Sequence, residues 1–113
     1  PDVLEYFVAA YSQWLDQGAY ALRIDTVPFM PGDYWRAFGD RMRAKQPGLF
    51  MFAEAFNYDA AKIAVHTYPE NGGISVLDFP GKQAMNEVFA AGQPFSALLP
   101  PLHLESQLYE NPY

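Results

Sequence analysis

Apolar residues recur along the chain at two spacings, one typical of helices and one typical of buried strands. Residues 3–17 carry apolar side chains three and four positions apart, which predicts an amphipathic helix. Asp2 and Glu5 have the spacing of a capping box, and Gly18 suits a left-handed cap at the other end. Residues 20–27 then form an almost continuous apolar run, which is typical of a parallel strand covered on both faces.

The same alternation continues through the middle of the chain. Asp33 is a suitable N-cap for a helix over residues 33–46, and residues 49–53 predict a second strand. A connection over residues 57–73 follows, and at this length we expect it to be functional or to contain a short helix. Residues 74–79 predict a third strand.

The last part of the chain is predicted to be helical. Met85, Val88 and Phe89 mark the apolar face of a further helix, and two short helical pieces are expected at residues 94–99 and 102–109. Helices and strands therefore alternate, which is typical of βαβ units in a parallel sheet. Three such strands form either a small open sheet or three consecutive strands of an eight-stranded barrel.

Composition narrows the classes of function. The net charge of −6 argues against a nucleic-acid partner and against an anionic membrane surface. No apolar run approaches the roughly 20 residues of a transmembrane helix. The chain has no cysteine, so it can form neither a disulfide nor a thiolate metal site. It begins at Pro1 without a methionine and ends abruptly at Tyr113, and we expect it to be part of a longer protein.

Acidic residues stand at or near the carboxyl ends of all three predicted strands. Asp25, Glu54 and Asp78 occupy these positions, where sites gather in parallel α/β proteins. Retaining glycoside hydrolysis needs two carboxyl groups roughly 5–5.5 Å apart. Neighbouring strands lie about 4.8 Å apart, so Asp25 and Glu54 suit this reaction. Asp78 either lines a cleft or has a structural, hydrogen-bonded role at its strand end.

The surroundings of the two acids predict different tasks for them. Arg23 and Asp25 are two positions apart, so on a strand they point to the same face, which we expect to be an interior. There Arg23 would keep Asp25 ionised. Glu54 follows an apolar run, and partial desolvation by these apolar neighbours favours the role of general acid. Two simpler interpretations stay open: a structural ion pair between Arg23 and Asp25, and an exposed acid at position 54.

Three motifs resemble signature regions of the α-amylase family, glycoside hydrolase family 13. Residues 20–27 (Tyr-Ala-Leu-Arg-Ile-Asp-Thr-Val) are similar to the second region, where Gly-Phe-Arg-x-Asp-Ala is usual. Residues 52–56 (Phe-Ala-Glu-Ala-Phe) resemble the third region, and residues 76–79 (Val-Leu-Asp-Phe) resemble the sixth barrel strand. Their order and spacing also agree with the family.

The resemblance implies an α/β fold that is a segment of a (β/α)8 TIM barrel, from about helix three to helix six with strands four, five and six. Residues 1–113 would be a partial catalytic barrel domain of a glycosidase acting on α-1,4-glucans by a retaining double displacement. Asp25 matches the nucleophile, Glu54 the general acid/base, and Arg23 the arginine that positions the nucleophile.

Two aromatic residues bear on substrate binding and on the type of reaction. Pro28 and Phe29 stand where the family often has Lys-His, on the leaving-group side of the cleft. Phe56 matches an aromatic found in cyclodextrin glucanotransferases, where it can stack on an acceptor sugar. The sequence therefore predicts a hydrolase of starch and maltooligosaccharides, with a cyclodextrin-forming or disproportionating α-glucanotransferase as the first alternative. The second alternative, which follows from the missing fourth region, is an inactive piece that only folds or binds glucan.

Several parts of the family's pattern have no counterpart in the sequence. The first and fourth regions and the small inserted domain with calcium ligands are absent, so we expect the isolated chain to be inactive. The chain itself implies no cofactor, although the parent enzyme could bind calcium through residues mostly outside it. The remainder of the barrel, or another chain, is expected to cover the exposed sheet edges. The resemblance favours a secreted or periplasmic location.

Overall fold

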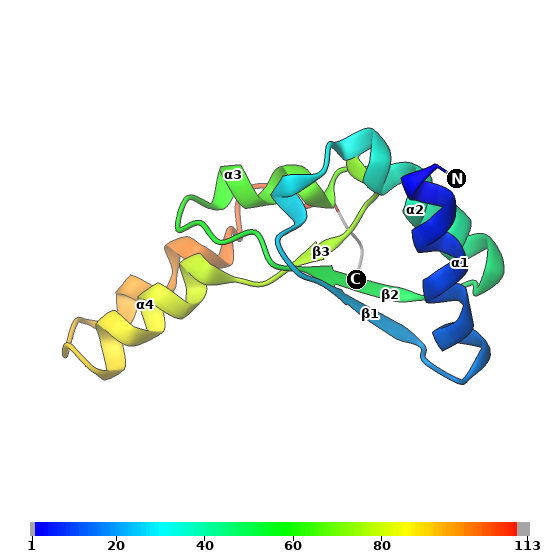
Figure 1. The fold of residues 1–113 in the computed structure, drawn as a ribbon. Helices are drawn as coiled ribbons and strands as arrows, with labels where there is room; N and C mark the ends of the chain where they lie inside the picture. Colours follow the sequence, from blue (N-terminus) through cyan, green and yellow to red (C-terminus); the bar gives the residue numbers. More distant parts are fainter. Residues whose placement is uncertain (1, 111–113) are drawn as a thin grey trace.

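The computed structural model describes residues 2–110 and contains helices and a small sheet (Figure 1). The elements are α1 (Val3–Asp16), β1 (Ala21–Ile24), α2 (Gly32–Lys45), β2 (Phe50–Ala53), α3 (Ala60–Ala64), β3 (Ser75–Val76) and α4 (Phe79–Phe89). The three strands are parallel, in the order β1-β2-β3. The predicted α/β organisation around a parallel sheet is therefore confirmed.

The strands are shorter than the sequence predicted. β1 ends at Ile24 instead of residue 27, because Thr26 adopts a left-handed backbone with φ 49° and a 3₁₀ turn follows over Val27–Phe29. β3 comprises only two residues of the predicted stretch 74–79. There the carboxylate of Asp78 accepts a hydrogen bond from the Gly81 N–H at 2.8 Å and begins α4.

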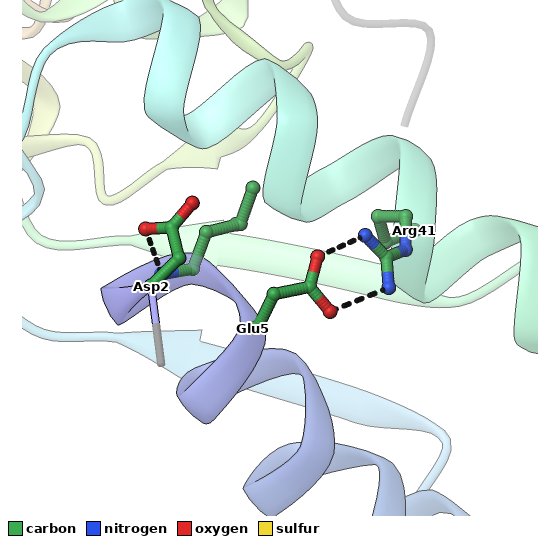
Figure 2. A network of polar contacts seen from close by, with 4 residues as sticks. Asp2, Glu5 and Arg41 are labelled. Atoms are coloured by element: carbon green, nitrogen blue, oxygen red, sulfur yellow. Dashed lines mark hydrogen bonds and ion pairs between the residues drawn. The ribbon is translucent and has the colours of Figure 1, made fainter.

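The caps of α1 are only partly as predicted. The Asp2 carboxylate accepts a hydrogen bond from the Leu4 N–H at 3.2 Å, as an N-cap does. Glu5 does not complete a capping box; both of its oxygens accept hydrogen bonds from Arg41 on α2, at 2.7 and 3.1 Å (Figure 2). At the other end Gly18 has φ 100° and forms the expected left-handed cap.

The start of α2 differs from the prediction. Pro31 is its N-cap, and Asp33 lies inside the first turn, where its carboxylate accepts a hydrogen bond from the next N–H, that of Tyr34, at 2.9 Å. An acid in this position still suits the positive end of the helix dipole. Near the other end of α2, Lys45 forms an ion pair with Asp16 of α1 at 2.7 Å. The two helices are therefore joined by charged side chains as well as by apolar packing.

The connection over residues 57–73 contains a short helix, as expected. Asp59 begins α3, and its carboxylate accepts a hydrogen bond from the Ala61 N–H at 3.0 Å. The turn at the end of the connection is fixed to α2, because Arg43 donates hydrogen bonds to the carbonyl oxygens of Gly72 and Gly73 at 2.8 and 2.9 Å. β3 begins two residues after this turn, at Ser75.

The core lies on one face of the sheet only, where the helices pack (Figure 1). Its members are Val8, Leu15, Ile24, Val27, Phe38, Met42, Leu49, Met51, Ala53, Ala55, Ile63 and Ile74. The opposite face of the described sheet is open, and Phe50 and Phe52 stack on it with ring centroids 5.7 Å apart. The prediction that the first strand is covered on both faces is thus wrong for residues 2–110.

The segment after β3 projects away from α1 and α2 (Figure 1). It makes the molecule long, with extents of 52 × 26 × 23 Å and a radius of gyration of 16.1 Å, against about 13 Å for a compact domain of 100 residues. α4 buries Ala84 and Val88, whereas Met85 and Phe89 of the predicted apolar face are exposed.

The two helical pieces expected after α4 are present only in part. 3₁₀ turns span Phe95–Leu98 and Pro100–Leu102, but residues 103–109 form no helix. Instead the chain returns to the sheet, where Tyr109 packs against the core. Within residues 2–110, no helix has the length and apolarity needed to cross a membrane.

Candidate active site

Asp25 and Glu54 come directly after β1 and β2, at the same edge of the sheet. Ile24 and Ala53 are register partners, and the Glu54 N–H donates a hydrogen bond to the Ile24 carbonyl oxygen at 2.8 Å. The Val27 N–H then donates to the Glu54 carbonyl oxygen at 3.1 Å. The two backbones therefore remain paired beyond the strands, which brings the two acidic positions side by side.

Arg23, Asp25 and Glu54 belong to the open face of the sheet, because side chains on a strand alternate between faces and Ile24 and Ala53 point into the core. The sequence predicted that Arg23 and Asp25 would lie in an interior. Both are exposed, with half of the Arg23 side chain accessible to solvent, because the described structure has no element on this face.

The cation also pairs with a different acid than predicted. An Arg23 Nη donates a hydrogen bond to a Glu54 Oε at 2.5 Å and forms an ion pair with it. Among residues 2–110, the Asp25 side chain forms no hydrogen bond or ion pair. The Arg23 side chain is long enough to cross to the neighbouring strand. The ion pair therefore joins Arg23 to Glu54 and not to Asp25.

Phe29 is exposed at the end of the 3₁₀ turn that follows β1. The turn is held in place by Trp35 of α2, whose Nε1–H donates a hydrogen bond to the Val27 carbonyl oxygen at 2.8 Å. A cavity of about 330 Å³ lies between this turn, the β1 strand, α1 and α2, and its wall includes Arg23, Asp25 and Phe29. Most of the remaining wall is aromatic.

Three aromatic rings gather beyond Glu54. Phe56, which is 65% exposed, contacts Tyr58 and Phe79 edge-to-face, with ring centroids 5.4 and 4.9 Å away. The sequence indicated Phe56 but not its two neighbours. Tyr58 had a signal, since it stands two positions after Phe56, whereas Phe79 comes from α4 and meets Phe56 only in the folded chain.

Within residues 2–110, no three His, Asp or Glu side chains are grouped so that they could hold a metal ion. His66 is partly buried, and this burial lowers its pKa from the usual 6.5. Asp78 caps α4, which supports its structural interpretation.

No family model matches the chain, but several characterised proteins do. A cyclomaltodextrin glucanotransferase of Niallia circulans is 35% identical over 86 residues, which is 75% of this chain and 12% of that protein. One of Bacillus licheniformis is 35% identical over 85 residues, and an α-amylase of Niallia circulans is 34% identical over 88 residues, 77% of this chain and 16% of that protein. The chain thus spans 12–16% of the length of these relatives.

Two crystal structures share the fold. The three-domain cyclomaltodextrin glucanotransferase CldA matches 96% of this chain and 23% of its own length, with a TM-score of 0.84 and 24% identity. An Anoxybacillus α-amylase matches 98% of this chain and 25% of its own length, also with a TM-score of 0.84 and 24% identity. The small parallel sheet and its helices therefore recur as a segment of larger chains.

The resemblance seen in the three strand motifs is confirmed by these comparisons: the chain is a homologue of the cyclomaltodextrin glucanotransferases and α-amylases of the α-amylase family.

Proposed function

We propose that this chain is part of the catalytic (β/α)8 barrel of an α-glucan-active enzyme, with β1, β2 and β3 as strands four, five and six. The observation that carries the proposal is the position of Asp25 and Glu54, side by side at the carboxyl ends of two paired parallel strands. Barrel enzymes build their sites at this edge. The homology to cyclomaltodextrin glucanotransferases and α-amylases supports an α-glucan as the substrate.

In the proposed reaction, Asp25 attacks the anomeric carbon of the sugar while Glu54 protonates the oxygen of the leaving glucan. A covalent glycosyl-enzyme forms on Asp25. Glu54 then removes a proton from water or from a sugar hydroxyl, whose oxygen attacks the anomeric carbon. The bond between this carbon and Asp25 breaks, and the anomeric configuration is retained overall. Arg23 is the third member of the group and positions the nucleophile, Asp25.

The Arg23–Glu54 hydrogen bond bears on this cycle. It occupies one Glu54 oxygen, at 2.5 Å, whereas the proposed role of Arg23 is to position Asp25. Arg23 is half exposed and has the length to turn toward Asp25, two positions along the same face. We therefore expect substrate binding to move Arg23 from the acid/base to the nucleophile.

The partner of the chain in this proposal is the rest of a barrel, supplied by the same protein or by another chain. It would cover the open face of the sheet, where Phe50 and Phe52 are stacked. Without that cover both acids face water, and exclusion of water strengthens the electrostatic interactions that such sites use. We therefore expect the 113-residue chain alone to show no measurable turnover of starch.

The nucleophile of the second step decides between hydrolysis and transfer. Water gives hydrolysis, and a sugar hydroxyl gives a cyclic or disproportionated glucan. Transfer is the second candidate, and Phe56 favours it, because an exposed ring beyond the acid can stack on an acceptor sugar and help it compete with water. Phe29 is proposed to contact the substrate on the leaving-group side.

Substitution of the two acids in the protein that contains this chain tests the proposal. Asp25→Asn and Glu54→Gln should each lower the turnover of starch by about 10²–10⁴-fold. Asp40→Asn on α2 and Glu105→Gln, both exposed and distant in sequence from the site, are matched controls that should keep full turnover. Full activity of Asp25→Asn would overturn the assignment, and cyclic or disproportionated products would identify transfer.

A further inference from the structure

A second cavity lies beyond the aromatic rings that follow Glu54. It has a volume of about 440 Å³ and opens between Tyr58, α4 and the segment after Pro100. Its wall contains the polar side chains of Gln83, Glu87 and His103. It is separate from the cavity beside β1, because the two have no wall residue in common.

The wall of this cavity has the chemistry that a neutral sugar requires. Gln83 and Glu87 are one helical turn apart, so the amide and the carboxylate extend from the same face of α4. Both are exposed, and among residues 2–110 Glu87 is in no ion pair, so its oxygens are open to hydroxyl donors. The amide offers both donors and an acceptor, as paired sugar hydroxyls need. The carboxylate disfavours an anionic ligand.

Tyr58 connects this cavity to the proposed catalytic acids. Its ring is 45% exposed, contributes to the cavity wall and contacts Phe56 at 5.4 Å. Phe56 stands two residues after Glu54. An elongated ligand can therefore run from the acid along two exposed rings into a cavity whose wall, otherwise mostly alanine and proline, contains polar groups. Apolar stacking comes first on this path and hydrogen bonding at its end.

We propose that the cavity formed by Tyr58, Gln83, Glu87 and His103 is an additional subsite for an α-glucan chain, beyond the position of Phe56. This inference rests on the proposed function, because it takes the ligand to be an α-glucan. It adds a preference for long chains, since a glucan bound at Glu54 has to extend past Phe56 and Tyr58 to reach Gln83 and Glu87.

The test is calorimetric titration with maltose and with maltoheptaose of the protein that contains this chain, with every variant made together with Asp25→Asn so that the sugar is not consumed. The variant Gln83→Ala/Glu87→Ala removes both polar groups from the wall and keeps α4, because alanine favours a helix. We expect its affinity for maltoheptaose to fall about 10-fold, as for the loss of two hydrogen-bonding groups, and its affinity for maltose to stay unchanged. The matched control Lys82→Ala/Asn86→Ala alters two other exposed residues of α4 that do not line the cavity, and it should bind both sugars normally.

Tyr58 gives an independent measurement. Tyr58→Ala should weaken maltoheptaose binding, and Tyr58→Phe, which keeps the ring, should restore most of it. Unchanged maltoheptaose affinity in Gln83→Ala/Glu87→Ala would overturn the subsite, and the proposed function would stand if Asp25→Asn still abolishes turnover. If the protein altered only by Asp25→Asn binds neither sugar and the unaltered protein does not turn over starch, the subsite and the proposed substrate are both wrong.

Discussion

The two ends of the molecule differ in how much of their apolar surface they bury. In the part formed by α1, β1, α2 and β2, the helices and strands share one core, and Met42 and Met51 are almost inaccessible to solvent. In the part from α4 to residue 104, large apolar side chains remain exposed, namely Met85, Phe89, Phe95, Leu99, Leu102 and Leu104. The first part also exposes large apolar side chains, among them Trp14, Tyr20 and Phe29, but it has a core of its own. The described residues from α4 to residue 104 bury only Ala84 and Val88.

Polar contacts show the same difference. The ion pairs Glu5–Arg41 and Asp16–Lys45 both join α1 to α2. Among residues 2–110, no ion pair involves α4 or the segment after it. The candidate acids lie between the two parts, at the edge where the sheet ends and the projecting segment begins. The part with the shared core thus holds the acids, while the surface that would meet a long ligand comes from the projecting part.

The same substitution made in both parts tests this comparison most strongly. Met51 is 2% exposed on β2 and Met85 is 49% exposed on α4. Met51→Ala leaves a cavity in the core and should lower the free energy of unfolding by about 2–5 kcal/mol. Met85→Ala should change it by less than about 0.5 kcal/mol. Urea denaturation of the chain measures both.

An equal loss in the two variants would contradict the comparison. It would mean that Met85 is buried in solution, for example against a second copy of the chain. Sedimentation of the two variants at the concentrations used for unfolding separates these cases, because burial against a second copy requires a dimer.

Features that depend on local sequence were predictable. The alternation of helical and strand-like segments predicted a parallel sheet. The acids that follow two apolar runs predicted the position of the candidate site. The ends of the strands were not predictable, because they depend on the left-handed backbone of Thr26 and on the capping role of Asp78. A run of apolar residues in the sequence indicates neither where the backbone turns left-handed nor which residue caps the next helix.

Contacts between distant residues were harder to foresee. Arg23 was expected to pair with its sequence neighbour Asp25, but the partner, Glu54, is 31 positions away and becomes a neighbour only through the strand register. Phe89 fits the apolar face of a helix, yet its burial depends on what α4 packs against. The Phe95 ring contacts it edge-to-face, with centroids 6.0 Å apart, but leaves it 68% exposed. The spacing of apolar residues predicts which face of a helix is apolar, but not which element packs against that face.

Two glycines sharpen the comparison at the level of the backbone. Gly72 has φ 98°, and a Cβ there would lie 2.9 Å from the backbone carbonyl of Trp35 on α2. Gly92, after α4, has φ 72°, but a Cβ there would meet nothing within 4 Å. Gly72→Ala adds a clash to the strain of a left-handed backbone and should cost about 2–4 kcal/mol, whereas Gly92→Ala should cost only the strain, about 1–2 kcal/mol.

Arg43 gives a check on the Gly72 prediction. Since Arg43 donates hydrogen bonds to the carbonyl oxygens of Gly72 and Gly73, Gly72→Ala should also loosen this turn and speed hydrogen exchange at the adjacent Ile74 N–H. Hydrogen exchange in Gly92→Ala should be unchanged at that position. A Gly72→Ala variant as stable as Gly92→Ala would show that the turn can move away from α2.

The smallest expected effect concerns the ion pair between α1 and α2. The hydrogen bonds from Arg41, followed by its positive charge, lower the pKa of Glu5 from its usual 4.5 (Figure 2). A carboxyl group whose pKa is lower in the folded state stabilises the fold above its unfolded pKa, and this contribution is lost as the pH falls through the folded value. Glu5→Gln should therefore destabilise the chain slightly at neutral pH, and the difference from the unaltered chain should vanish in acid, well below pH 4.5.

Two further measurements test whether Arg41 causes the effect of Glu5→Gln on stability: added salt, and substitution of a second acidic residue. Both partners are exposed, so added salt should screen the interaction and shrink the effect of Glu5→Gln at neutral pH. Glu105→Gln removes another exposed carboxylate, one for which the described residues provide no ion pair, and its thermal stability should follow that of the unaltered chain at every pH. A Glu5→Gln difference that persists in acid would instead point to the packing of this side chain between α1 and α2.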